Sequence, residues 1–65
     1  MTQKEKILKH MREHNGITNM EAFKHYGITR LSGRIYELRR DGHHIRNVPQ
    51  ETEDGRHYDR FVLEE

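Results

Sequence analysis

Apolar residues recur at helical spacing in the central stretch Thr-Arg-Leu-Ser-Gly-Arg-Ile-Tyr-Glu-Leu-Arg-Arg. Leu31, Ile35 and Leu38 follow the i, i+4, i+7 pattern of one helical face, because each residue turns an α-helix by about 100°. The opposite side is polar and carries arginines around Gly33. The pattern predicts an amphipathic helix over about residues 30–41, with one face buried in the core and the other exposed.

The first helix is predicted from its two ends. Thr2 and Glu5 fit a capping box, in which a threonine hydroxyl and a glutamate carboxylate each accept a hydrogen bond from a free backbone N–H. Asn15 and Gly16 tolerate the left-handed conformation that ends many helices. The helix therefore spans about residues 3–14.

The second helix is short and leads directly into the central one. Thr18 and Glu21 form a second capping box, which places this helix at about residues 19–25. Gly27 permits the tight turn that follows, and Thr29 is a good N-cap residue for the central helix. Two short helices joined by a glycine-containing turn are typical of a helix-turn-helix.

Two strands are predicted after the helices. Residues 44–48 contain two apolar positions and stop at Pro49, which cannot donate to a sheet ladder. Asp54 and Gly55 mark a turn, and residues 56–63 contain four aromatic or branched apolar side chains. A two-stranded hairpin is not stable alone in water, so we expect it to pack on the helices.

These elements predict an α+β fold, with three helices followed by a two-stranded β-hairpin, as a single domain over residues 1–65. We expect one hydrophobic core to join the helices to the hairpin. Its predicted members are Leu8, Met11, Phe23, Ile28, Leu31, Ile35, Leu38, Ile45, Phe61 and Leu63.

The composition changes this picture in two respects. The 65 residues include no cysteine, so neither a disulfide nor a cysteine-based zinc site stabilises the fold. The net charge is only +1, but it is unevenly distributed. Residues 24–46 carry six Lys or Arg against two Asp or Glu, whereas residues 47–65 carry two against six. A basic middle segment is typical of contact with a polyanion such as nucleic acid, and the acidic last third is not.

Other classes of function have little support in the residues. No apolar run is long enough to span a membrane, so we expect a cytoplasmic protein without a membrane partner. We expect no enzyme and no cofactor, because Ser32 is the only serine and neither a glycine-rich phosphate loop nor a pair of catalytic carboxylates is evident. His10 and His14 have the spacing of a helical metal chelate, but zinc needs further ligands, and we expect no metal.

Residues 17–23, 26–32 and 34–39 resemble a family of small helix-turn-helix proteins from bacteriophages and integrated mobile elements. These stretches are Ile-Thr-Asn-Met-Glu-Ala-Phe, Tyr-Gly-Ile-Thr-Arg-Leu-Ser and Arg-Ile-Tyr-Glu-Leu-Arg. The order of elements is similar to that of winged helix-turn-helix domains over almost the whole chain. The resemblance implies that the hairpin is the wing and that the protein binds double-stranded DNA at the nucleoid of a bacterial host cell. Such proteins serve as repressors, as excisionase-like architectural factors or as inhibitors of host defence.

The polar face of the central helix is the candidate DNA-binding surface. Gly33 lets the helix approach the bases, and arginine to guanine is the commonest specific contact in the major groove. Phosphates are expected at Thr29, at Lys24, and at Arg39 or Arg40. The residues expected to contact DNA are Thr29, Arg30, Ser32, Gly33, Arg34, Tyr36, Glu37, Arg40 and Lys24.

The wing offers further candidate contacts. Arg56, His57 and Arg60 are expected to reach a flanking phosphate or the minor groove, although the acidic residues of the same hairpin would repel phosphate. A single small module contacts few base pairs, and no dimerisation helix is evident. We therefore expect a homodimer or side-by-side copies on the DNA.

Two alternatives stay open on the sequence alone. The polar face is an ordinary solvated surface if Arg34 and Arg40 pair with Glu37 through i, i+3 contacts. The protein is an interaction module on the same fold if the acidic wing contacts another protein. An example would be a phage-encoded inhibitor that binds a host defence or polymerase protein.

Overall fold

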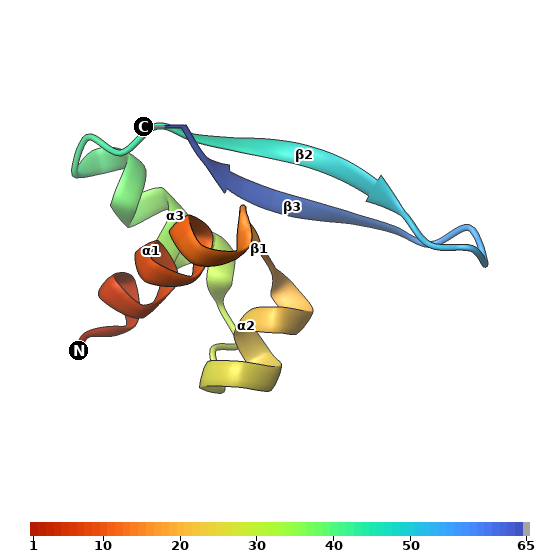
Figure 1. The fold of residues 1–65 in the computed structure, drawn as a ribbon, viewed down its shortest axis with the longest axis horizontal. Helices are drawn as coiled ribbons and strands as arrows, with labels where there is room; N and C mark the ends of the chain where they lie inside the picture. The colour runs from red at the N-terminus through yellow and green to blue at the C-terminus, as the bar shows by residue number, and fades with distance from the viewer. Residues whose placement is uncertain (65) are drawn as a thin grey trace.

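The computed structural model describes residues 1–64; Glu65, which belongs to the acidic last third, lies outside the described residues. The elements in order are α1 (Gln3–His14), β1 (Ile17–Thr18), α2 (Asn19–Tyr26), α3 (Leu31–Arg40), β2 (Ile45–Glu51) and β3 (His57–Leu63). The helices gather at one end of the molecule, and the β2–β3 hairpin projects away from them (Figure 1). The described chain is thus an α+β fold with three helices and a three-stranded antiparallel sheet.

Side-chain caps explain where α1 and α2 begin. The Thr18 hydroxyl accepts from the Glu21 N–H at 3.1 Å, and Glu21 Oε1 accepts from the Thr18 N–H at 3.0 Å, so the capping box of α2 is complete. At α1 the Thr2 hydroxyl accepts from the Glu5 N–H at 3.2 Å. There the Glu5 carboxylate accepts from the Thr2 hydroxyl, which differs from a full capping box. Asn15 ends α1 with a left-handed φ of 57°.

A short strand that the sequence does not predict joins the helices to the wing. β1 pairs with β3 in antiparallel register, Ile17 opposite Phe61 and Thr18 opposite Arg60, and the sheet order is β1-β3-β2. The sheet therefore contains a strand beyond the two-stranded hairpin that was predicted. Two residues are too few to show an alternating pattern, and here both are buried.

β2 runs further than predicted because a proline is tolerated at a sheet edge. Pro49 lies opposite Asp59, and pairing continues to Glu51 opposite His57. β2 is an outer strand in the sheet order, where the missing N–H can face solvent. The strand ends at Glu51 rather than near residue 48.

The core lies between the helices and the end of the sheet where β1 pairs with β3. Leu31, Ile35 and Leu38 of α3 are each 1% exposed, which confirms that the apolar stripe of this helix is buried. The buried apolar residues are Ile7, Met11, Ile17, Ala22, Ile28, Leu31, Ile35, Leu38, Ile45 and Phe61. Burying a leucine or isoleucine fully is worth about 1.5–3 kcal/mol, so α3 is anchored and its rotation about its own axis is fixed.

The prediction that Phe23 belongs to the core is wrong. Its side chain is 62% exposed, and Ala22 and Tyr26 face the core from α2 instead. Residues 22 and 26 are four apart and share a helical face, whereas residue 23 is turned by about 100° from residue 22. Leu8 and Leu63, also predicted in the core, are partly buried and pack at its edge.

Gly16 links α1 to β1 at a point where a side chain does not fit. Its φ is +123°, a conformation that residues with a Cβ rarely adopt. A Cβ there would lie 2.9 Å from the Arg60 Cγ and 3.0 Å from the carbonyl oxygen of Phe61. The carbonyl is backbone, so it cannot move without disturbing the pairing of β1 with β3.

We expect Gly16→Ala to lower the free energy of unfolding by about 2 kcal/mol or more, because backbone strain and the contact with β3 add together. Gly55→Ala is the matched control. Its φ is +85°, but an added Cβ would meet no heavy atom within 4 Å among residues 1–64. That control should lose only the strain, about 1 kcal/mol. Urea unfolding measures both, and equal losses would show that the contact with β3 is unimportant.

One histidine is buried where α1 packs against α2. His10 is 5% exposed, and its Nδ1 lies 2.9 Å from the Tyr26 hydroxyl. Its Nε2 has no hydrogen-bond partner within the described chain, and the Glu21 Oε1 is 3.9 Å away. The rings of His14 and His25 lie 4.5 and 5.6 Å from the His10 ring. Burial, reinforced by these two histidines, lowers the pKa of His10 below its ordinary value, although Glu21 opposes the shift.

This buried histidine should make the fold sensitive to mild acid. In the unfolded chain His10 takes up a proton near its ordinary pKa of about 6.5, whereas the folded chain resists protonation. Its contribution to stability is therefore complete above about pH 6.5 and is lost as the pH falls toward the folded pKa. Thermal unfolding between about pH 7.5 and 5 measures this, and His10→Gln should show a shallower decline. If stability fell with pH in the same way in His10→Gln and in the unaltered protein, His10 would not be the source of the acid sensitivity.

Candidate nucleic-acid interface

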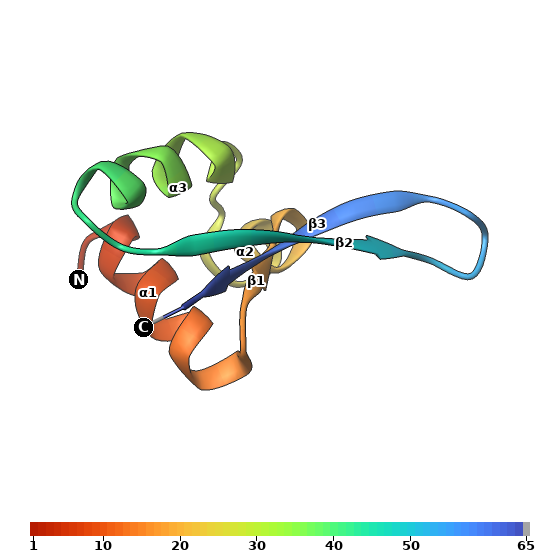
Figure 2. The same cartoon turned by 90° about the horizontal axis from the view of Figure 1, so that it is seen from above.

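The outer face of α3 is open along its length. Ser32, Gly33 and Tyr36 are exposed, and Arg34 and Glu37 are partly exposed beside them. A Cβ on Gly33 would meet no heavy atom within 4 Å in the part of the chain that the structure describes. Figure 2 shows α3 along one side of the molecule, with the hairpin projecting beyond the helices. The wing therefore leaves this face accessible to a partner.

α3 begins without a side-chain cap. Arg30, with φ −123° and ψ 57°, occupies the N-cap position, so the predicted N-cap role of Thr29 is wrong. Ile28 closes the preceding turn: it is buried, and its N–H donates to the Ala22 carbonyl at 3.2 Å. Only Thr29 and Arg30 separate it from Leu31, the first residue of α3. The first turn of α3 contains no acidic residue. Its free N–H groups can therefore receive an external acceptor such as a phosphate.

Arg34 is held by two side chains. Its Nε donates to Gln3 Oε1 at 2.9 Å, and its Nη1 donates to a carboxylate oxygen of Glu37. The pairing with Glu37 is the i, i+3 contact that a solvated helix face also forms. Gln3 was not among the predicted residues, because it lies 31 positions away in α1 and no local pattern reports such a contact.

The two arginines at the end of α3 differ in availability. Arg40 extends over the Tyr36 ring, with 6.0 Å from its Cζ to the ring centroid, and remains exposed. Arg39 turns toward the sheet instead. Its Nε and Nη2 donate to the carbonyl oxygen of Ile45 at 3.1 and 2.9 Å, and Nη2 donates to Asn47 Oδ1 at 2.6 Å. Arg39 is therefore engaged with the start of β2, and of the two arginines expected at a phosphate, Arg40 is the one available to contact it.

An ion pair joins α1 to the end of α3 beside this face. Lys4 Nζ lies 2.7 Å from Asp41 Oδ2, and Asp41 is the C-cap residue of α3. The hydrogen bond from Lys4, together with its charge, lowers the pKa of the Asp41 carboxyl below its ordinary value. An ion pair that reaches solvent adds little stability, but this one neutralises an acid that would repel phosphate.

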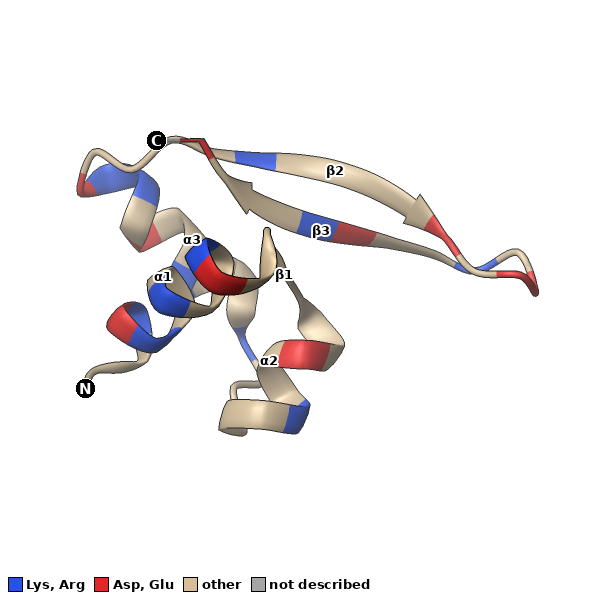
Figure 3. Cartoon of the chain, viewed as in Figure 1, with Lys and Arg blue, Asp and Glu red and all other residues tan. Residues whose placement is uncertain are grey.

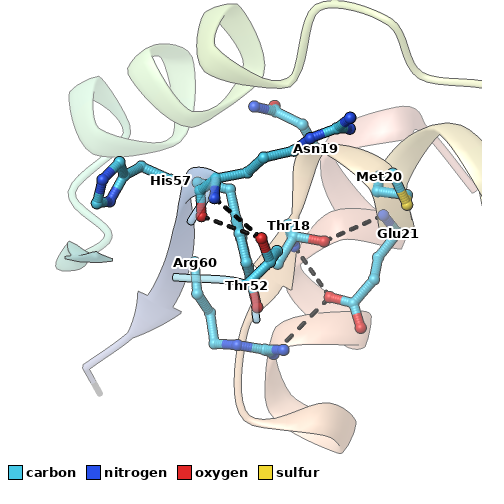
Figure 4. A pocket seen from close by; sticks show the side chains of 9 residues that line it. Thr18, Asn19, Met20, Glu21, Thr52, His57 and Arg60 are labelled. Atoms are coloured by element: carbon cyan, nitrogen blue, oxygen red, sulfur yellow. Dashed lines mark hydrogen bonds and ion pairs between the residues drawn. The ribbon is translucent and has the colours of Figure 1, made fainter. Parts of the chain in front are cut away.

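A cleft between the start of α2 and the wing forms a second part of the surface (Figure 4). Its volume is about 530 Å³. The residues that line it are Thr18, Asn19, Met20, Glu21, Thr52, Arg56, His57, Tyr58 and Arg60. The wing residues predicted to contact DNA thus line one cleft. Asn19, Met20 and Thr52 were not among the predicted contact residues, because the cleft is formed by two segments that lie far apart in the sequence, the start of α2 and the wing.

The three basic wing residues differ in how exposed their side chains are and in how firmly the fold holds them. The Arg56 side chain is 83% exposed, and its Nε lies 3.3 Å from Asp54 Oδ2. His57 begins β3 and is exposed. Arg60 is 29% exposed, and its Nη1 lies 3.7 Å from Glu21 Oε1, so it ties the wing to α2. Arg56 and His57 are therefore better placed than Arg60 for contact with a partner.

Acidic residues gather toward the tip of the wing. Glu51, Glu53 and Asp54 flank or form its turn, and all three are exposed. Figure 3 shows this acidic tip at one end of the molecule and the arginines at the end of α3 near the other. A polyanion is therefore attracted to the helical body and repelled by the tip.

Within residues 1–64 no set of three or more His, Asp or Glu side chains is arranged to hold a metal ion. None of the helices in the described chain combines the length and the apolar character that crossing a bilayer requires.

A family model described as a winged helix-turn-helix domain matches residues 2–65. The chain belongs to this winged helix-turn-helix family. Domains of this family are typically DNA-binding and non-enzymatic. In this winged helix-turn-helix chain, α2 and α3 form the helix-turn-helix and β2 and β3 form the wing. No curated protein and no solved structure gives a significant match.

The open face of the winged helix-turn-helix domain can be tested at Gly33. Alanine is favoured over glycine inside a helix by about 1 kcal/mol, so Gly33→Ala should raise the free energy of unfolding by about that amount. Gly42→Ala is the contrasting control, because Gly42 also has open space around it in the described chain but has a φ of +103°. That variant should be destabilised. Urea unfolding measures both, and a loss of stability in Gly33→Ala would reveal a contact on this face.

Proposed function

We propose that this protein binds double-stranded DNA sequence-specifically, with α3 in the major groove. It would act as a transcriptional regulator or excisionase-like architectural factor of a bacteriophage or mobile element. The observation that carries the proposal is the uncovered polar face of α3, where exposed Arg30 and partly exposed Arg34 flank Gly33. A major groove about 12 Å wide admits one α-helix, and a glycine at the centre of the face permits a close approach to the bases.

The side chains on this face divide by chemistry into base and phosphate contacts. Arg30 and Arg34 can donate two hydrogen bonds to guanine, and Glu37 can accept from cytosine N4. Ser32 and Tyr36 carry hydroxyl groups at the same surface. Phosphate contacts are assigned to Thr29, Lys24 and Arg40, which are exposed around the helix.

The cleft between α2 and the wing suits the flanking part of the DNA. Arg56 and His57 reach it from the wing, and the start of α2 reaches it from the other side. A sugar-phosphate strand beside the major groove would enter here, next to Arg56 and His57, with the acidic tip of the wing adjoining it. This arrangement limits the wing contribution to the residues that line the cleft.

One such module contacts few base pairs, so useful affinity requires more than one copy. Specific protein–DNA complexes typically have dissociation constants of about 10⁻⁸ to 10⁻¹¹ M, and helix-turn-helix dimers occupy two half-sites together. We therefore propose that a homodimer or side-by-side copies occupy repeated sites, in the cytoplasm and nucleoid of a bacterial host.

The double variant Arg30→Ala/Arg34→Ala tests the assignment of α3. Each arginine–guanine contact is worth about 1–3 kcal/mol, so losing both should weaken binding at least about 30-fold. The DNA is first obtained by selecting bound duplexes from a random-sequence pool, and affinity is then measured by gel shift. Circular dichroism melting should show a folded variant.

Lys9→Ala/Arg46→Ala is the matched control, because it removes the same formal charge from exposed residues of α1 and β2. It should retain sequence preference. If Arg30→Ala/Arg34→Ala binds the selected DNA as tightly as the unaltered protein, α3 is not the DNA-binding helix.

A protein-interaction module is the second candidate, and two observations favour it. Met20 is 77% exposed and Phe23 62% exposed on α2, and the wing tip is acidic. Exposed apolar side chains beside charged ones are common at protein interfaces. Measuring binding to random DNA at several salt concentrations separates the two candidates. For a DNA-binding protein, the logarithm of the binding constant falls with the logarithm of the salt concentration, with a slope of about −0.9 per phosphate contacted. A module that binds only protein should show no DNA binding even at about 50 mM salt.

A further inference from the structure

The first turn of α1 makes two long-range contacts with the outer side of α3. Gln3 Oε1 accepts a hydrogen bond from Arg34 Nε at 2.9 Å, across 31 positions of sequence. The neighbouring Lys4 Nζ lies 2.7 Å from Asp41 Oδ2, across 37 positions. Both contacts lie outside the α2–α3 pair, so α1 takes part in arranging the surface that α3 presents.

Gln3 restrains Arg34 without cancelling its charge. An arginine side chain loses considerable rotamer freedom when it is fixed, and a restraint already present in the free protein reduces that loss on binding. Glu37 also restrains Arg34, but its carboxylate compensates the positive charge. The carboxamide of Gln3 is neutral, so it sets the direction of the guanidinium without adding a second compensating charge to that of Glu37. Two of the five guanidinium N–H donors are used by Gln3 and Glu37, and the other three remain for a base.

We propose that Gln3 is a positioning residue that sets the base preference of Arg34. This inference rests on the proposed function, because it requires α3 to contact bases. It places part of the specificity determinant in the first turn of α1, which does not itself enter the groove. Substitution of Gln3 therefore weakens the base-pair preference at one position of the site more than it changes general affinity for DNA.

The test compares discrimination at a single base pair. The position that Arg34 contacts is identified first, as the one whose preference is lost in Arg34→Ala when bound duplexes are selected from a random pool. Gln3→Ala should then reduce the ratio of affinities for the best and the second base pair at that position by about two- to tenfold, the range of one hydrogen bond. Preferences at the other positions, affinity for scrambled DNA and the urea midpoint should stay unchanged.

Two further variants separate positioning from packing. Gln3→Glu keeps an acceptor for Arg34 Nε, so it should restore the ratio at that position even though its charge lowers affinity for all DNA. Lys4→Ala removes the other contact between α1 and α3 without touching Arg34. It should leave the ratio unchanged.

Three results would overturn the inference alone while leaving the proposed function intact. They are an unchanged ratio in Gln3→Ala, an equal loss in Lys4→Ala, and a uniform rise of affinity in Gln3→Ala, which would mean that Gln3 holds Arg34 away from DNA. Selection of no preferred sequence by the unaltered protein is a different result. It would remove the proposed function and this inference with it.

Discussion

Burial of one face of α3 is the constraint on which the rest of the structure depends. Leu31, Ile35 and Leu38 are almost completely removed from solvent, and each is worth about 1.5–3 kcal/mol when buried. A small domain has few such residues, so this stripe can lie only against the core. The polar side of the helix must then face outward. The exposure of Gly33 and its neighbours follows from the packing of the opposite side.

The sheet holds this arrangement together from the other end of the chain. Phe61 of β3 is buried and lies opposite Ile17 of β1, so the wing is attached to the segment between α1 and α2. Arg39 connects the end of α3 to the start of β2 through the Ile45 carbonyl. A hairpin of this length is unstable alone, and these contacts convert it into part of the domain. Its outer part has no such support and projects into solvent, as Figure 1 shows.

Local patterns predicted much of the fold, although two local predictions, Phe23 in the core and Thr29 as an N-cap, were wrong. The capping box of Thr18 and Glu21 and the buried stripe of α3 depend on residues within one or two turns, and both are present in the structure. Contacts between residues far apart in the sequence leave no local pattern from which they could be predicted. Gln3 meets Arg34, and Arg60 meets Glu21, only because the chain folds back on itself. The same limit explains β1, which is too short to alternate.

The small number of basic side chains left without a partner in the described part of the fold favours specificity from base contacts over general affinity for phosphates. Several basic residues are already committed within the fold: Lys4 pairs with Asp41, Arg39 binds β2, and Arg60 pairs with Glu21. Sequence-independent affinity for DNA grows with the number of phosphates neutralised, so a domain with few free cations and an acidic wing tip binds random DNA weakly. Under the proposed function, such a protein would gain its affinity from base contacts and from neighbouring copies. Discrimination between sites would then depend on how rigidly a few side chains of α3 are held, so the side chains that hold Arg34 would matter along with Arg34 itself.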